Sequence, residues 1–198
     1  MANYFDIAFT PTTLDLQELK GSGGLYADST GDGTSTPHPL SAGEIDMITS
    51  RDSLYVATVS ESGWPYVQHR GGEQGFVKIL DQHTIGWVER TGNRQYIGTG
   101  NITANAKLAM ILVDYPTRTR LKLYGEASYY SSPSADLLAS LGSDVRDDGA
   151  ITVVVLATNW NCPKYLTPRF TKEEVGEAVG QLQARIAELE ANLGGHPH

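Results

Sequence analysis

The stretch from Leu54 to Gly72, "LYVATVSESGWPYVQHRGG", holds two short segments rich in β-branched and aromatic residues, one on each side of the turn residues "ESGWP". Such a pattern is typical of two strands joined by a short connection. The second segment ends in His69 and Arg70 and is followed by Gly71 and Gly72. Because glycine has no side chain, another group can approach the backbone closely there. The stretch predicts two strands, the second of which ends at a surface open to a flat or bulky ligand.

Four further segments share this strand-like composition and are separated by turn residues. They are "GFVKILD" (75–81), "TIGWVER" (84–90), "RLKLYGEASYY" (120–130) and "AITVVVLATNW" (150–160). Six short strands of this kind predict a mainly β, α+β fold with an antiparallel barrel or sandwich. The segment 101–116 is ambiguous, because residues 104–108 look helical and residues 109–114 look like a buried strand.

Helical patterns flank these strands. Helices are expected over 12–21 and 41–53, the second with Ser41 and Glu44 as a capping box, and over 133–144. The last helix begins at a Thr171/Glu174 capping box and carries an apolar stripe at alternating spacings of four and three residues. The stripe consists of Val175, Val179, Leu182, Ile186, Leu189 and Leu193. We expect it to dock on its own domain or on a twin subunit.

Three regions follow from these patterns. Residues 1–40 hold an N-terminal helix and an irregular loop rich in Gly, Ser, Thr and Pro. Residues 41–170 form the strand-rich domain, and residues 171–198 form the C-terminal helix and tail. At 198 residues the chain is long enough to bury a core without a disulfide or a metal.

Composition excludes several classes of protein and site. Cys162 is the only cysteine, so neither an intramolecular disulfide nor a cysteine-based metal cluster is expected, and the five scattered histidines suggest no metal site. No segment approaches the length of a membrane span, and the N-terminus does not look like a signal peptide. We therefore expect a cytoplasmic protein with no membrane partner.

The net charge of −8 argues against general binding to nucleic acid. The charge is uneven, because the segment 64–124 contains eight Lys or Arg against four acidic residues. A cationic middle within an acidic chain favours a local anionic ligand, although random scatter of surface charge would also produce it.

The segment "RTGNRQYIGTGN" (90–101) contains a turn followed by Asn93, Arg94 and Gln95. An Arg side chain, an amide side chain and free backbone N–H groups are the donors that a phosphate monoester needs. The following "GTGN" lacks the third glycine and the βαβ context of a dinucleotide-binding fingerprint. A phosphate site without a nucleotide-binding fold is the interpretation that remains.

Alternation along residues 117–125 predicts that Arg118, Arg120 and Lys122 share one strand face while leucines occupy the other. That face is either cationic lining of a site or an ordinary solvated surface. His69 is more often a structural hydrogen-bonding residue than a catalyst in such a position. Cys162 is likewise more typical of a packing thiol than of a nucleophile.

The order and spacing of these segments resemble the pyridoxamine 5'-phosphate oxidase-like family of FMN-binding split β-barrel proteins. The matching segments run from about Leu54 to Phe170 and are "LYVATVSESGWPYVQHRGG", "GFVKILD", "GNRQYIGTGN", "DYPTRTRLKLYGEA" and "NWNCPKYLTPRF". The resemblance implies a six-stranded Greek-key split barrel with flanking helices. It also implies a homodimer that holds FMN at the subunit interface.

Carried over by position, the resemblance assigns cofactor contacts to several residues. From "QHRGG" these are Gln68, His69, Arg70 and Gly71, and from the phosphate motif "GNRQY" they are Asn93, Arg94 and Gln95; Arg120, Lys122, Cys162 and Arg169 complete the set. Gln95 stands where the family motif has lysine. The sequence identifies no catalytic residue.

The function that the resemblance implies is that of an FMN-dependent oxidoreductase, which moves hydride or electrons between FMN and an unidentified small molecule. Pyridoxamine phosphate itself is not expected, because the vitamin B6 oxidases end in an Arg-Leu-x-Pro segment where this chain runs from "TPRF" into a helix. Two alternatives stay open. One is a non-catalytic flavin-binding or redox-sensing module, and the other is a split barrel that binds F420 or haem.

Overall fold

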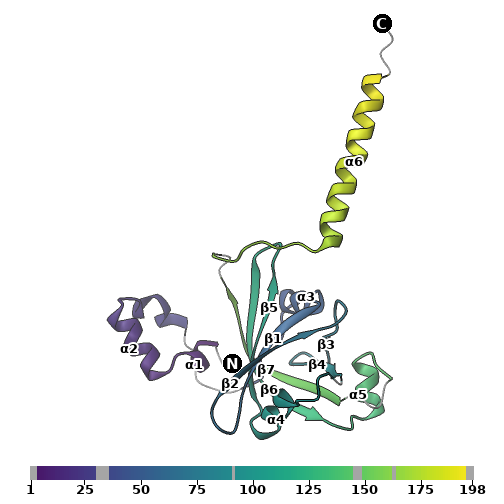
Figure 1. The fold of residues 1–198 in the computed structure, drawn as a ribbon. Coiled ribbons are helices and arrows are strands. Elements are labelled where there is room, and N and C mark those ends of the chain that lie inside the picture. Colours follow the sequence, from purple (N-terminus) through teal and green to yellow (C-terminus); the bar gives the residue numbers. More distant parts are fainter. Residues whose placement is uncertain (1–3, 30–35, 91, 145–148, 162–163, 195–198) are drawn as a thin grey trace. The chain divides into compact units, whose positions relative to one another are not determined.

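The computed structural model describes residues 4–29, 36–90, 92–144, 149–161 and 164–194. The chain divides into two compact units. The first comprises Met1–Asp114 and Thr119–Cys162, and the second comprises Tyr115–Arg118 and Pro163–His198. The sheet belongs to the first unit (Figure 1).

The first unit is built on one antiparallel sheet with the strand order β2-β1-β5-β6-β7-β4-β3. Its strands are β1 (Ser53–Val59), β2 (Pro65–Gly71), β3 (Lys78–Ile79), β4 (Thr84–Glu89), β5 (Lys107–Asp114), β6 (Thr119–Tyr130) and β7 (Gly149–Asn161). The expected antiparallel, α+β class is confirmed, but the expected number of strands is wrong, since the described residues form a sheet of seven strands rather than six. The Greek-key connection stays a prediction.

The additional strand comes from the ambiguous segment 101–116. The helix there lies earlier than expected, as α4 (Ile97–Ala104), and it ends because Asn105 is extended, with φ −146° and ψ 107°. From Lys107 the residues alternate, and Leu108, Met110 and Leu112 are buried. This period of two lets the segment pair with β1 and β6 at once, which a helix could not do.

The sheet is strongly curved, so that strands far apart in its hydrogen-bonded order come into contact. Arg70 at the end of β2 forms an ion pair with Glu89 at the end of β4, with 2.5 Å between Nη2 and Oε1. Four strands separate β2 from β4 within the sheet. The curvature therefore gives the sheet a concave side and an outer side.

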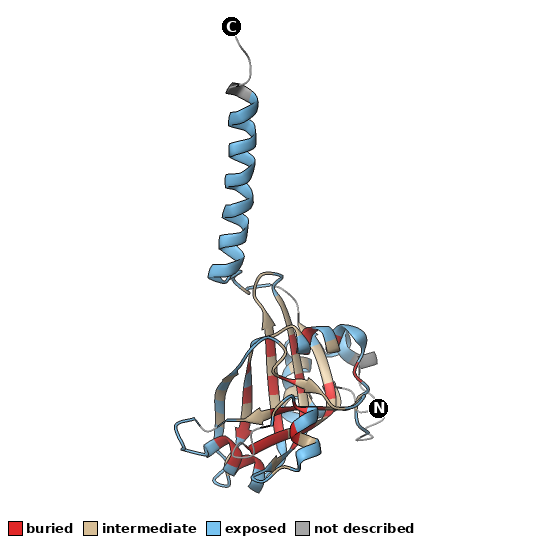
Figure 2. Cartoon of the chain, turned by 90° about the vertical axis from the view of Figure 1, so that its right-hand side faces the viewer, coloured by how far each residue is buried: buried red, intermediate tan, exposed pale blue. Residues whose placement is uncertain are grey.

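The concave side holds the hydrophobic core, which Figure 2 shows as buried segments along the central strands. Trp87 and strand residues on every second position fill it, including Leu54, Val56, Leu121 and Leu123, each at most 2% exposed. The predicted alternation of the segment 119–125 is confirmed for Leu121 and Leu123, which face the core.

Helices flank the sheet in the first unit. They are α1 (Tyr4–Ala8), α2 (Pro11–Leu19), α3 (Ala42–Thr49), α4 and α5 (Ala135–Ser140), together with the 3-10 helix η1 (Gly23–Ser29). The Ser41/Glu44 capping box is confirmed at α3, and Ser134 caps α5 by accepting a hydrogen bond from Leu137. Gly142, with φ 75°, follows α5 where the sequence predicts a helix stop.

The second unit contains α6 (Lys172–Gly194). Its predicted capping box is confirmed: Thr171 N donates to Glu174 Oε2 at 2.7 Å, and Glu174 N donates to Thr171 Oγ1 at 3.1 Å. Among the described helices, α6 included, none is long and apolar enough to cross a membrane.

Candidate functional site

Alternation along β2 divides the predicted site residues between the two sides of the strand. Tyr66, Gln68 and Arg70 are partly buried, while Val67 and His69 are exposed. Successive strand side chains point to opposite faces, so His69 does not share a surface with Arg70. The His69 ring instead packs edge to face against the ring of Tyr55, its cross-strand partner, with 5.5 Å between the ring centroids.

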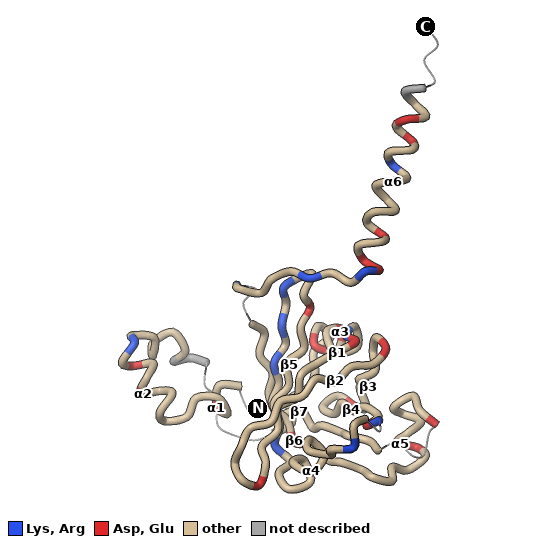
Figure 3. The backbone as a smooth tube through the Cα atoms, in the orientation of Figure 1, with Lys and Arg blue, Asp and Glu red and all other residues tan. Residues whose placement is uncertain are grey.

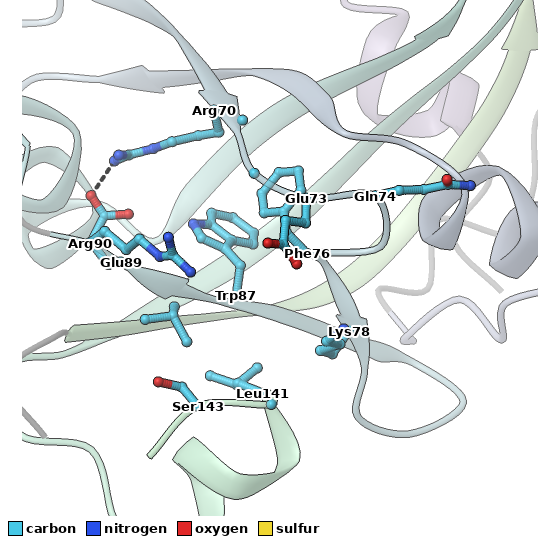
Figure 4. Close-up of a pocket in the computed structure, with 14 residues that line it drawn as sticks. Arg70, Glu73, Gln74, Phe76, Lys78, Trp87, Glu89, Arg90, Leu141 and Ser143 are labelled. Atoms are coloured by element: carbon cyan, nitrogen blue, oxygen red, sulfur yellow. Dashed lines mark ion pairs between the residues drawn. The ribbon is translucent and has the colours of Figure 1, made fainter. Parts of the chain in front are cut away.

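Two neighbours hold the guanidinium of Arg70 in place, Glu89 and Gln68. Figure 4 shows the ion pair with Glu89. Besides the ion pair with Glu89, the amide oxygen of Gln68 accepts from Nη2 at 2.8 Å and from Nε at 3.1 Å when the amide is oriented to suit these donors. Gln68 can lie here because position 98 is glycine, since a Cβ at Gly98 would come within 2.3 Å of that amide. Arg70 is thus oriented before any ligand arrives.

Glu89 is a largely buried carboxylate beside this arginine. Burial raises the pKa of Glu89, and the charge of Arg70 and the indole N–H of Trp87 only partly oppose that rise. Glu89 Oε2 and Trp87 Nε1 are both buried without a hydrogen bond of good geometry. The pKa of this carboxyl group is therefore above its usual value, and its Oε2 atom makes no hydrogen bond of good geometry.

The loop that follows β4 has an unusual backbone. Arg94 and Tyr96 adopt left-handed conformations, with φ 60° and 51°, which are uncommon for residues other than glycine. Asn93 Oδ1 accepts a hydrogen bond from Gln95 N at 3.1 Å and so closes the turn. Strained backbone of this kind tends to occur at binding sites.

The loop leads into α4 without a side-chain cap, because Tyr96, the N-cap residue, makes no capping hydrogen bond. The first N–H groups of a helix have no intrahelical acceptor, and the helix dipole favours negative charge beside them. Ile97, Gly98 and Thr99, which form this first turn, line a hollow that we call the loop hollow.

The loop hollow, of about 130 Å³, brings together five of the eleven predicted cofactor residues. Of the predicted set it contains Gln68, Arg70, Asn93, Arg94 and Gln95, and it adds Arg90 as a further cation. Among the described residues that line it, Glu89 is the one acidic side chain, and it is already paired with Arg70. Such a combination of guanidinium groups, amides and a helix N-terminus suits a phosphate group.

A second hollow, of about 220 Å³, shares Arg70, Glu89 and Arg90 with the first. We call it the tryptophan hollow, because Trp87 forms its centre in Figure 4, with Phe76 beside it. Gly71, another predicted residue, lines this hollow together with Gly72. Arg70 and Glu89 therefore lie where the two hollows adjoin.

Other predicted residues lie elsewhere. Lys122 lines a groove on the outer side of the sheet with Tyr4, Tyr55, Ala57, Val67, Ala109 and Ile111, which we call the outer groove. Arg120, opposite Val113 and Asn161 in the sheet, lines none of these three hollows. Arg118, expected on the same face, lies before β6 in the turn of the second unit. Figure 3 shows where the charged residues lie along the chain.

Two predicted residues belong to the connector before α6. Cys162 lies outside the described residues. Arg169 is in the second unit, where its guanidinium lies 4.9 Å from the ring centroid of Tyr115.

Several lining residues were missed by sequence reasoning. Strand alternation, which puts Gln68 and Arg70 on the same side of β2, would also have identified Tyr66 as a lining residue. The segment 97–100 was noticed only as a rejected dinucleotide motif, although its glycine-rich helix start lines the loop hollow. Glu89 carried no sequence signal, because its role depends on the curvature of the sheet.

Comparisons with known proteins identify the family and the fold of this chain. The family model of pyridoxamine 5'-phosphate oxidase matches residues 45–159, more than half of the chain. A proposed pyridoxamine 5'-phosphate oxidase from Lactobacillus delbrueckii has a TM-score of 0.50 and 20% identity over 61% of this chain and 93% of that one. A variant of the Group A Streptococcus protein HupZ has a TM-score of 0.50 and 19% identity over 62% of this chain and 99% of that one.

A haem storage protein of Vibrio cholerae, HutZ, also matches, with a TM-score of 0.44 and 17% identity over 60% of this chain and 91% of that one. No curated protein matches the sequence. Among the described residues, no group of three His, Cys, Asp or Glu could hold a metal ion. The family model covers the strands, the loop and the helix start that form the loop hollow, and the chain belongs to the pyridoxamine 5'-phosphate oxidase family.

Proposed function

We propose that this protein binds FMN and uses it as an oxidoreductase acting on a small molecule. The observation that carries the proposal is the loop hollow, where Arg90 and Arg94, the Asn93–Gln95 turn and the uncapped start of α4 meet. These groups supply charge-assisted and backbone donors for a phosphate monoester. The adjoining tryptophan hollow offers space next to the phosphate for a larger, flat portion of the same ligand.

Each residue would have a distinct role in holding the cofactor. Arg94, Gln95 and the first turn of α4 would hold the phosphate. Arg70 would provide a fixed positive charge between the phosphate and the flavin ring, because Glu89 and Gln68 already orient it. Bound FMN supplies the hydride or electron transfer, and a nearby cation favours its reduced form. The substrate is proposed to differ from pyridoxamine phosphate.

We also propose a homodimer that completes the cofactor site. The outer groove is lined mainly by apolar residues, and one of them, Val67, is 62% exposed. Exposed apolar surface of this kind is typical of protein interfaces. His69 and Lys122 lie on this outer side, so they would reach FMN only across the interface between two copies.

The absorbance spectrum of the purified protein, with mass identification of anything bound, tests the cofactor directly. We expect flavin bands, with a maximum near about 450 nm, or their appearance with tight binding when FMN is added. A haem Soret band, a deazaflavin spectrum or a failure to bind FMN would each contradict the proposal. Reduction of the bound FMN by NADH or NADPH, followed by its reoxidation, supports the oxidoreductase. Bound FMN that neither nucleotide reduces supports a non-catalytic module.

Replacement of Arg94 tests the phosphate contact. Arg94→Ala should weaken FMN binding by about 1 to 3 kcal/mol, or roughly five- to 150-fold in Kd, because it removes charged hydrogen bonds. Titration followed by flavin fluorescence measures the change. The control is Lys107→Ala, which removes an exposed cation that lines neither hollow. Equal affinity of the two variants would remove Arg94 from the site.

A further inference from the structure

The exposed stripe of α6 has a regular spacing that the proposed function does not explain. Val175, Val179, Leu182, Ile186 and Leu189 follow one another at intervals of four, three, four and three residues, and each is between 44 and 65% exposed. Apolar residues at this spacing form one narrow seam along a helix. A seam of this kind is the contact surface of a coiled coil.

The seam residues also indicate how many helices would associate. In a heptad assignment, Val179 and Ile186 occupy a positions, while Leu182 and Leu189 occupy d positions. In parallel coiled coils, β-branched residues at a with leucine at d favour two strands. Gly176 and Gly180 lower the intrinsic helix propensity of the first turns, so this helix depends on packing against a partner.

Charges beside the seam identify the partner and its direction. Arg185 occupies a g position and Glu190 the e position of the next heptad. In a parallel pair of identical helices in register, Arg185 of each chain lies beside Glu190 of the other, which gives two interhelical ion pairs. In an antiparallel pair with full overlap, g positions face each other. Arg185 of one chain would then lie beside Arg185 of the other, which places two positive charges together.

We propose that α6 forms a parallel, in-register, two-stranded coiled coil with α6 of a second copy of this chain. The inference rests on the heptad spacing and the charges of α6 and does not depend on which cofactor the protein binds. A parallel pair places both helices around one two-fold axis, so the whole dimer would share that axis. Joining the helices would raise the local concentration of the two sheet domains.

Disulfide trapping in the full-length chain tests the geometry. In a Cys162→Ser background, Leu182→Cys puts the only thiol at a d position, where two parallel chains bring their Cα atoms within disulfide range. The matched control is Gln181→Cys, the adjacent residue at an outward c position. We expect the Leu182→Cys chain to cross-link at least about tenfold faster than the control in a glutathione buffer, on non-reducing gels. Equal rates would overturn the proposal.

A mixture of chains tests direction. In an antiparallel pair, position 182 faces position 186 of the partner, so chains with Leu182→Cys and chains with Ile186→Cys would cross-link with each other faster than either alone. That result would overturn the parallel arrangement. Faster cross-linking of each chain with its own kind supports it.

Charge exchange tests the register. Two differently tagged Leu182→Cys chains are co-expressed, one with Arg185→Glu and the other with Glu190→Lys. The mixed pair has attractive charges at both sites, and each like pair has repulsive ones, so mixed dimers should exceed the roughly half expected for random pairing. The i, i+3 contact of Arg185 with Glu188 lies within one chain and does not affect partner choice. Random pairing would overturn the in-register ion pairs.

Discussion

At the scale of single residues, the pairing of Arg70 with Glu89 governs both the shape and the electrostatics of the site. Arg70 lines both hollows, as Arg90 does, and it is the one paired with Glu89. Burial raises the pKa of Glu89, and the charge of Arg70 partly opposes that rise. Removal of one partner from a buried ion pair leaves an unpaired charge, which costs more than removal of both. The pair should therefore behave as a unit in mutation.

We expect Arg70→Met to lower the free energy of unfolding by about 2 kcal/mol at neutral pH, since both groups retain some contact with solvent. Because the pKa of Glu89 is already raised, protonation relieves its unpaired charge, so the loss should shrink as the pH falls. Arg70→Met with Glu89→Gln should recover most of the loss. Urea unfolding at several pH values measures the cycle, and additive losses would show that the residues are not coupled.

At the scale of elements, the sequence predicted best where a local rule decides the structure. The Ser41, Ser134 and Thr171 caps depend on hydrogen bonds within one turn, and all three are present. The segment 97–114 was predicted poorly, because the boundary between α4 and β5 depends on pairing with β1 and β6, which are distant in sequence. Long-range pairing also explains why Gln68 and the turn at Asn93 could be named as candidates but not shown to meet.

The segment before α3 is fastened to β7 by a small polar cluster around Glu44, which is 4% exposed. Glu44 accepts hydrogen bonds from Ser41 N and Ser41 Oγ, both at 2.7 Å, and from Thr158. It also accepts one from His38 Nε2 at 3.2 Å. Burial alone would raise the pKa of Glu44, but these hydrogen bonds together lower it below its usual value of 4.5. The cluster thus stabilises the fold while Glu44 is ionised.

A lowered pKa makes this contribution dependent on pH. The contribution is complete above the unfolded pKa and is lost as the pH falls through the lower folded pKa, because the unfolded chain binds the proton more readily. Glu44→Gln should cost about 1 to 3 kcal/mol at neutral pH. Chemical denaturation at neutral pH and at about pH 3 measures the difference between the two proteins, which should become smaller in acid. A difference that grows in acid would contradict the assignment.

At the scale of the whole molecule, the outer side of the sheet differs from an ordinary solvated surface. Cross-strand neighbours on β2, β1 and β5 there are Val67, Ala57 and Ala109, with Tyr55 and Ile111 in the next row. A row of small and apolar residues lets another surface approach closely, whereas Arg70 and Gln68 on the opposite side of β2 remain available to a ligand. One strand would in this way serve the cofactor site with one face and the subunit contact with the other.

Val67→Arg tests whether the outer face of β2 forms the subunit contact. A charge at the centre of an apolar contact should weaken dimerisation by at least about 1.4 kcal/mol, or roughly tenfold in Kd, as measured by sedimentation over a range of concentrations. The thermal midpoint of the monomer should hardly change, because Val67 is 62% exposed. Ser128→Arg, at an exposed position on β6, is the control. FMN affinity should fall together with dimerisation if the second copy completes the site, and a dimer unaffected by Val67→Arg would place the subunit contact on another surface.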